Sequence, residues 1–181
     1  PMPEFYVYKD GRVSITGAKL TQVFGTIVYA SVTWGGDFNI RLIARTDPST
    51  KFTRRYGEPI NPSDLKFGDY LGIEGTLDIN ANNFGVIATA VKNLSDQIQQ
   101  ADFSGTVTAV DVSTGIFNLG IKDGSNIQIS AGSAEITKGS RPLSTYQLQV
   151  GDKIISAAGT YNHENKILQA RKIKVYADLS A

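Results

Sequence analysis

The sequence contains no cysteine and only one each of histidine, tryptophan and methionine. Without cysteine the chain forms no disulfide bond, no Cys-ligated zinc site and no thiol nucleophile. The single histidine, His163, cannot build a zinc site or a triad by itself, and we interpret residues 162–165 around it as an exposed hairpin loop. Phosphate loops, paired carboxylates and nucleophile motifs are also missing. We therefore expect a non-enzymatic protein without a cofactor or metal.

Charge is scarce and evenly divided. Charged residues make up 19% of the chain. Residues 1–97 contain 10 Lys/Arg and 10 Asp/Glu, and the remainder contains 8 Lys/Arg and 7 Asp/Glu. Neither half is a polycation. No run approaches the ~18 apolar residues that a membrane helix needs, and no signal-peptide core is present. The protein is therefore either cytosolic or has lost a leader. Abundant Ser, Thr, Asn and Gly favour an extracellular or cell-envelope protein, whose leader we expect to have been removed or to lie outside this sequence.

A tandem repeat organises the chain. Residues 65–77 return in similar form as residues 148–161, each copy containing a Leu-x-x-Gly-Asp motif and a later Gly-Thr pair. Leu65 and Leu148 are 83 positions apart, whereas Gly75 and Gly159 are 84 positions apart. The second copy therefore has one additional residue in the strand after Gly-Asp, which predicts a β-bulge there.

Each copy reads as five short strands with turn signals between them. We match Gly25-Thr26 with Gly105-Thr106 as the bend of a long first strand, and the Gly35-Gly36 hairpin with residues 113–115. The halves then diverge through residues 51–57 and 135–139. A proline-containing connection follows in each copy and has room for only one helical turn.

This order predicts an all-β protein of two tandem five-stranded Greek-key barrels of the OB type. An SH3-like barrel or an open sandwich is the alternative. A further β-hairpin is expected at the N-terminus, with its turn at Asp10-Gly11. The expected divisions are residues 1–17 for this hairpin, 18–97 for the first barrel and 98–181 for the second.

The repeated motif resembles a family of exported bacterial OB-like domains of unassigned function. It is carried in the two copies by Gly25, Thr26, Leu65, Gly68, Asp69, Gly75, Ala88 and Val91, then by Gly105, Thr106, Leu148, Gly151, Asp152, Gly159, Ala170 and Ile173. The resemblance spans nearly the whole chain. Because these are structural glycines and apolar positions, it implies a fold and a non-enzymatic role rather than an active site.

Two sets of residues are candidates for binding. The N-terminal segment Phe5, Tyr6, Val7 and Tyr8 could add as a strand to another copy, to form a homo-oligomer or filament, or to a surface polymer. As the alternative function, Trp34, Phe52, Arg54, Arg55 and Tyr56 combine aromatic rings with cations, as in a surface that binds single-stranded nucleic acid or another polyanion. We place Trp34 in the loop between the first two strands, where it either stacks on a ligand or folds back on its own barrel.

Residues 78–83 resemble the first half of a calcium loop, with oxygen-bearing side chains at alternate positions. Asn83 stands where the turn glycine is needed, and Thr89 stands where a bidentate Glu is needed. Asn and Asp also favour ordinary turns. We interpret this segment as a hairpin loop.

Overall fold

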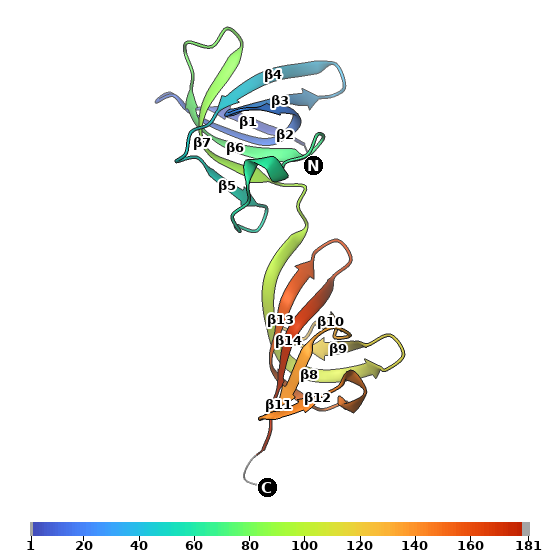
Figure 1. The fold of residues 1–181 in the computed structure, drawn as a ribbon. Coiled ribbons are helices and arrows are strands. Elements are labelled where there is room, and N and C mark those ends of the chain that lie inside the picture. Colours follow the sequence, from blue (N-terminus) through green and yellow to red (C-terminus); the bar gives the residue numbers. More distant parts are fainter. Residues whose placement is uncertain (1, 179–181) are drawn as a thin grey trace. The chain divides into compact units, whose positions relative to one another are not determined.

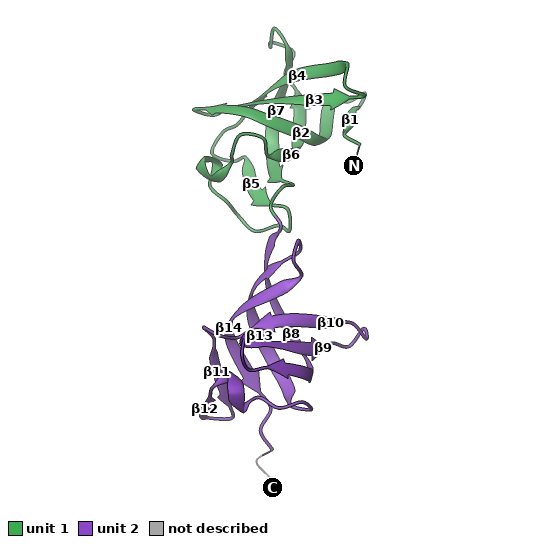
Figure 2. Ribbon diagram, turned by 90° about the vertical axis from the view of Figure 1, so that its right-hand side faces the viewer, with its two compact units in different colours: residues 1–96 green, residues 97–181 purple. Residues whose placement is uncertain are grey.

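The computed structural model describes residues 2–178, which are almost entirely strands and turns (Figure 1). The chain divides into unit 1, residues 1–96, and unit 2, residues 97–181, each with its own sheet (Figure 2). The expected all-β class is confirmed. Unit 1 contains β1 (Glu4–Val7), β2 (Arg12–Phe24), β3 (Ile27–Trp34), β4 (Phe38–Arg45), β5 (Lys51–Arg54), the 3-10 helix η1 (Pro62–Asp64), β6 (Tyr70–Leu77) and β7 (Phe84–Asn93). Unit 2 contains β8 (Ile98–Asp111), β9 (Ile116–Gly120), β10 (Asn126–Ser130), β11 (Glu135–Lys138), β12 (Arg141–Leu143), the 3-10 helix η2 (Thr145–Gln147), β13 (Lys153–Asn162) and β14 (Ile167–Val175).

The pairings among five strands of unit 1 return to their starting point. β2 pairs with β3, β3 with β4, β4 with β7, β7 with β6, and β6 with β2. The β4–β7 pair is parallel and the others are antiparallel. β2 takes part twice because it is long: it pairs with β6 up to Lys19 and with β3 from Lys19 onward. Alternation along the strands sends one set of apolar side chains into a single core, where Ile15 and Ile73 are fully buried.

Unit 2 repeats this cycle with β8, β9, β10, β14 and β13, and β10–β14 is its parallel pair. The same backbone contacts mark equivalent points in the two units. Leu20 donates its N–H to the carbonyl of Asp69 at 2.7 Å, and Val107 donates its N–H to the carbonyl of Asp152 at 2.9 Å. β2 therefore corresponds to β8, and the tandem repeat is present in the fold.

In the part of the chain that the structure describes, each sheet has seven strands rather than the five that we expected. β5 lies parallel to the last residues of β7, and β11 lies in the same way along β14. Residues 51–57 and 135–139, where the sequence halves diverge, therefore begin with equivalent strands. β12 pairs with β11, and β1 pairs with β2.

The predicted equivalence of Gly25 and Gly105 is wrong. Gly25 has a φ of +61° and lies in the turn between β2 and β3, so it does not bend a strand. Gly105 lies within β8, where a Cβ atom would stand 2.1 Å from the carbonyl oxygen of Gly120. Its counterpart is Ala18, because Ala18 pairs with Leu71 as Gly105 pairs with Ile154. The shared Gly-Thr dipeptide therefore aligned two different parts of the repeat.

The predicted hairpin match fails for the same reason. Gly35-Gly36 lies in the turn from β3 to β4, whereas residues 113–115 lie in the turn from β8 to β9. Trp34 is consequently the last residue of β3 and does not lie in the loop between the first two strands of the repeat.

The bulge predicted in the second copy is confirmed. The β8–β13 register shifts between Ile154 and Ala157, where β13 has one residue more than β8. In unit 1 the additional residue is on the opposite strand: Thr16 and Ala18 pair with successive residues of β6 and leave out Gly17, which has a φ of +87°. The division expected after residue 17 thus falls inside β2, and the N-terminal hairpin belongs to the sheet of unit 1.

The connections before β6 and β13 contain only the single turns η1 and η2, as predicted. The aspartate of each Gly-Asp motif closes the turn that lies between this 3-10 helix and the next strand. Asp69 accepts a hydrogen bond from the N–H of Lys66 at 2.8 Å, and Asp152 accepts one from the N–H of Gln149 at 2.9 Å. These carboxylates stabilise the entry to the strand in both units.

Candidate binding surface

The N-terminal segment forms a hairpin with the first half of β2. Glu4 to Val7 pair with residues 13–16 of β2, and the N–H of Tyr8 donates to the carbonyl of Arg12 at 2.8 Å. Asp10 closes the turn by accepting from the N–H and Nε of Arg12 at 3.1 and 2.8 Å. Of the strands in residues 2–178, β1 pairs with β2 alone, and it is an edge strand of its sheet. The predicted Asp-Gly hairpin is therefore confirmed.

The inner side of β1 closes one end of the core of unit 1. Phe5 packs edge-on against Phe84, with ring centroids 4.7 Å apart, and against Trp34 at 6.1 Å. The indole N–H of Trp34 donates to the carbonyl of Pro3 at 3.1 Å. Trp34 therefore folds back on its own unit, and its polar atom is occupied by the segment that precedes β1.

The other apolar side chains of residues 5–8 face water. Tyr6 is 51% exposed, Val7 49% and Tyr8 45%. The Tyr6 and Tyr8 rings stack at 6.4 Å, and the guanidinium of Arg12 lies 4.6 Å from the centre of the Tyr8 ring. These apolar side chains lie on a strand whose outer backbone edge has no partner strand in the described chain.

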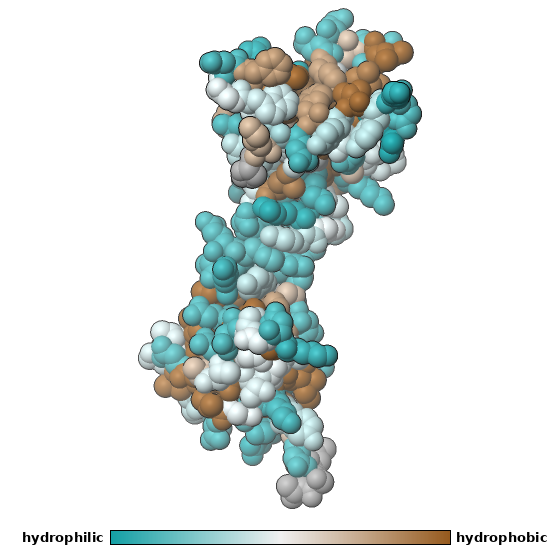
Figure 3. Space-filling view, turned by 180° about the vertical axis from the view of Figure 1, so that it is seen from behind, coloured by the Kyte–Doolittle hydropathy of each residue, from teal (hydrophilic) through white to brown (hydrophobic). Residues whose placement is uncertain are grey.

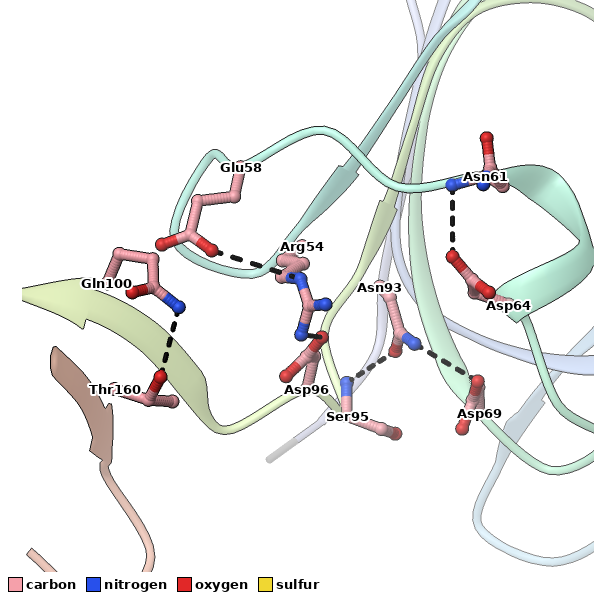
Figure 4. A network of polar contacts seen from close by, with 10 residues as sticks. All are labelled: Arg54, Glu58, Asn61, Asp64, Asp69, Asn93, Ser95, Asp96, Gln100 and Thr160. Atoms are coloured by element: carbon pink, nitrogen blue, oxygen red, sulfur yellow. Dashed lines mark hydrogen bonds and ion pairs between the residues drawn. The ribbon is translucent and has the colours of Figure 1, made fainter. Parts of the chain in front are cut away.

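Phe52, Arg54, Arg55 and Tyr56 lie on β5 and in the turn after it. Phe52 packs against the core of unit 1. Arg54 is held by two carboxylates, with Nε 3.9 Å from Glu58 and Nη1 3.0 Å from Asp96 (Figure 4). Arg55 donates to the carbonyl of Leu94 at 3.2 Å and lies over the ring of Tyr56. These cations are engaged by their own unit.

The two parts of the predicted polyanion surface lie at opposite ends of β7. Phe5 connects Trp34 to Phe84, the first residue of β7, whereas Arg54 pairs with Asn93, the last residue. Nine residues of extended strand span roughly 30 Å. Trp34 and Arg54 therefore do not form one stacking surface.

The segment at residues 78–83 behaves as a turn. Asp78 is nearly buried, accepts from the N–H of Asn80 at 3.1 Å and forms an ion pair with Arg45 at 3.2 Å. His163 is half-buried rather than exposed, and its Nε2 lies 2.8 Å from Oε1 of Gln99. Within residues 2–178 no three His, Cys, Asp or Glu side chains gather in a way that could hold a metal ion.

Hydrogen bonds within tight turns account for the carboxylates with altered acidity. The hydroxyl and N–H of Ser113 lower the pKa of Asp111, and those of Ser125 lower the pKa of Asp123. The hydroxyl and N–H of Ser49 lower the pKa of Asp47 in the same way. The N–H and the guanidinium of Arg12 lower the pKa of Asp10 in its turn. All four carboxylates are exposed and stabilise turns.

Sequence reasoning missed Phe38 and Phe84, which extend the aromatic cluster around Trp34. The rings of Trp34 and Phe38 are 5.7 Å apart, and Phe38 is 61% exposed. Their positions beside the Gly35-Gly36 turn and at the start of a strand provided no signal, because the cluster forms only when β1, β3, β4 and β7 are assembled. Figure 3 shows that apolar side chains gather on one face of unit 1.

No known family model matches the chain, and no curated protein is significantly similar to it. No helix in the described part of the chain is long and apolar enough to cross a membrane. The features that bear on its function are the two sheets and the exposed edge at β1.

Proposed function

We propose that this chain is a non-enzymatic structural or binding module of the cell surface or envelope, and that it assembles with other copies by strand addition through β1. We further propose that each unit is a small Greek-key barrel of the OB type. The barrel proposal is supported by the cyclic pairings β2–β3–β4–β7–β6 and β8–β9–β10–β14–β13, with one parallel pair in each.

The observation that carries the assembly proposal is the exposed outer edge of β1. Tyr8 directs its N–H to Arg12 on β2, and successive residues of a strand direct their backbone groups to opposite sides. The N–H groups of Phe5 and Val7 therefore point away from β2. An edge of this kind, flanked by Tyr6 and Tyr8, is a template for another strand.

Substitution of one residue can block this edge without breaking the hairpin. Val7→Pro removes an outward N–H and leaves the hydrogen bonds between β1 and β2 in place, and proline is tolerated at an edge position. Val7→Thr keeps both the N–H and the branching at Cβ, so it is the matched control. Analytical ultracentrifugation over a range of concentrations reports the mass of each variant.

We expect the parent chain and Val7→Thr to associate beyond the 19.5 kDa monomer as concentration rises. We expect Val7→Pro to remain monomeric with a similar melting temperature. A parent chain that stays monomeric at about 1 mM would exclude self-association through this edge, since weak interfaces assemble at that concentration. Equal association of Val7→Pro and the parent chain would exclude β1 as the interface.

A further inference from the structure

The place that β1 occupies in unit 1 has no strand in the described part of unit 2. Val13 pairs with Gly75 on one side and with Val7 of β1 on the other. Ala101 is its counterpart in unit 2, because it pairs with Gly159 as Val13 pairs with Gly75. Among the described strands, residues 101–104 of β8 have a neighbour on the β13 side only, since β9 begins to pair with β8 at Thr106.

Backbone groups at this edge point outward. Val107 uses both its N–H and its carbonyl to pair with Asp152 and Gly151 on the β13 side. The bulge of this pair lies on β13, so the alternation along β8 is uninterrupted between Ala101 and Val107. Asp102 and Ser104 therefore direct their N–H and carbonyl groups away from β13, as Arg12 directs its carbonyl to Tyr8 of the β1 hairpin.

Apolar side chains next to this edge are less well covered than their counterparts in unit 1. In unit 1 the positions concerned are no more than 1% exposed: Val13, Ile15, Val32 and Leu42. The strand registers identify the counterparts in unit 2, all of which are half-buried: Ala101, Phe103, Ile121 and Ile127. The difference coincides with β1, whose Phe5 packs against the core of unit 1.

We propose that residues 101–104 of β8 accept an extended segment of another polypeptide, which pairs antiparallel to β8 and completes unit 2. The arrangement of β1 on β2 defines the chemistry of this partner. Phe5 pairs with Ile15 and Val7 with Val13, so the incoming segment carries an aromatic side chain opposite Phe103 and an aliphatic one opposite Ala101. Main-chain hydrogen bonds supply affinity, and the aromatic side chain supplies specificity.

This site rests on the strand-addition mode proposed above, but it lies on the other unit and acts as an acceptor. The two proposals can therefore fail separately. A chain carrying Val7→Pro loses the outer edge of β1 and keeps the edge of β8, so it should bind a peptide at β8 as the parent chain does.

The test uses a fluorescein-labelled synthetic peptide with the sequence of residues 2–9, titrated with the full chain and followed by anisotropy. We expect a dissociation constant of about 10–100 µM. Asp102→Pro removes an outward N–H and should weaken binding at least about tenfold, whereas Asp102→Asn, which keeps the N–H, should change it less than about threefold. A peptide in which the Phe5 position is alanine should also bind at least about tenfold more weakly.

Amide NMR shifts of the labelled parent chain locate the peptide without any substitution. We expect shifts at Ala101, Asp102, Phe103 and Ser104, and at Ile121. Shifts confined to β2 would mean that the peptide displaces β1 in unit 1, and this would overturn the proposal. No anisotropy change with about 1 mM chain, or equal binding by Asp102→Pro, would also overturn it.

Discussion

Gly75 and Gly159 occupy the same position in their units, and neither position has room for a side chain. A Cβ atom on Gly75 would lie 2.1 Å from the carbonyl oxygen of Ile87, and one on Gly159 would lie 2.1 Å from that of Gln169. Both glycines lie at a register shift between the last strands of the cycle. The repeated glycine thus permits two backbones to approach closely.

Gly75→Ala should lower the free energy of unfolding by about 2–4 kcal/mol, because the strand must move away from Ile87. Gly159→Ala should do the same in unit 2. Gly132→Ala is the control, since a Cβ there meets no atom within 4 Å. Urea unfolding followed by circular dichroism measures the three variants. A loss for Gly75→Ala no greater than that for Gly132→Ala would contradict the close approach.

Phe5→Ala should expose the indole of Trp34 and lower the stability of unit 1. Phe5 lies against Trp34 and Phe84, so its removal should shift the tryptophan emission to longer wavelength and cost about 2 kcal/mol. Trp34 is the sole tryptophan, so the emission reports this site alone. Tyr6→Ala on the exposed side should leave the emission unchanged. Identical spectra for Phe5→Ala and the parent chain would show that Phe5 does not cover Trp34.

Single-stranded nucleic acid should not alter the fluorescence of Trp34. Pro3 accepts from the indole N–H, Phe5 covers the ring, and Arg54 is paired with Glu58 and Asp96 at the other end of β7. The measurement is a titration with mixed-sequence single strands at low salt, up to about 50 µM, where stacking proteins respond. Saturable quenching would restore the polyanion hypothesis.

Ser125→Ala should raise the pKa of Asp123 toward its ordinary value of 3.8, because the serine hydroxyl and N–H hold it below that value. A carboxylate whose pKa is lowered by folding stabilises the folded chain above the pKa of the unfolded state. This stabilisation is lost as the pH falls through the folded pKa. Carboxyl-carbon NMR shifts measured below pH 5 follow the titration, and Asp111, paired with Ser113, is the internal control. An unchanged Asp123 in Ser125→Ala would show that its backbone contacts alone set the pKa.

Local sequence signals predicted those features that depend on a few neighbouring residues. Asp10-Gly11 indicated a hairpin, and the spacing of Gly75 and Gly159 indicated a bulge. Each is a property of turn geometry or of residue count, which the chain carries wherever it folds. The Gly25 match failed because a dipeptide contains too little information to set the alignment of a whole strand.

The sequence by itself determined that the chain is all-β, that it is a tandem repeat and where the additional residue of the second copy lies, because alternation, turn residues and spacing are local. Only the tertiary structure decided that Phe5 covers Trp34, that Trp34 and Arg54 lie apart, and that β1 covers β2 while the equivalent edge of β8 has no strand beside it among residues 2–178. These relationships depend on which distant strands pair and in which register. The pairing and register are set by the burial of the apolar side chains of all the strands together, so they cannot be predicted from a short stretch of sequence.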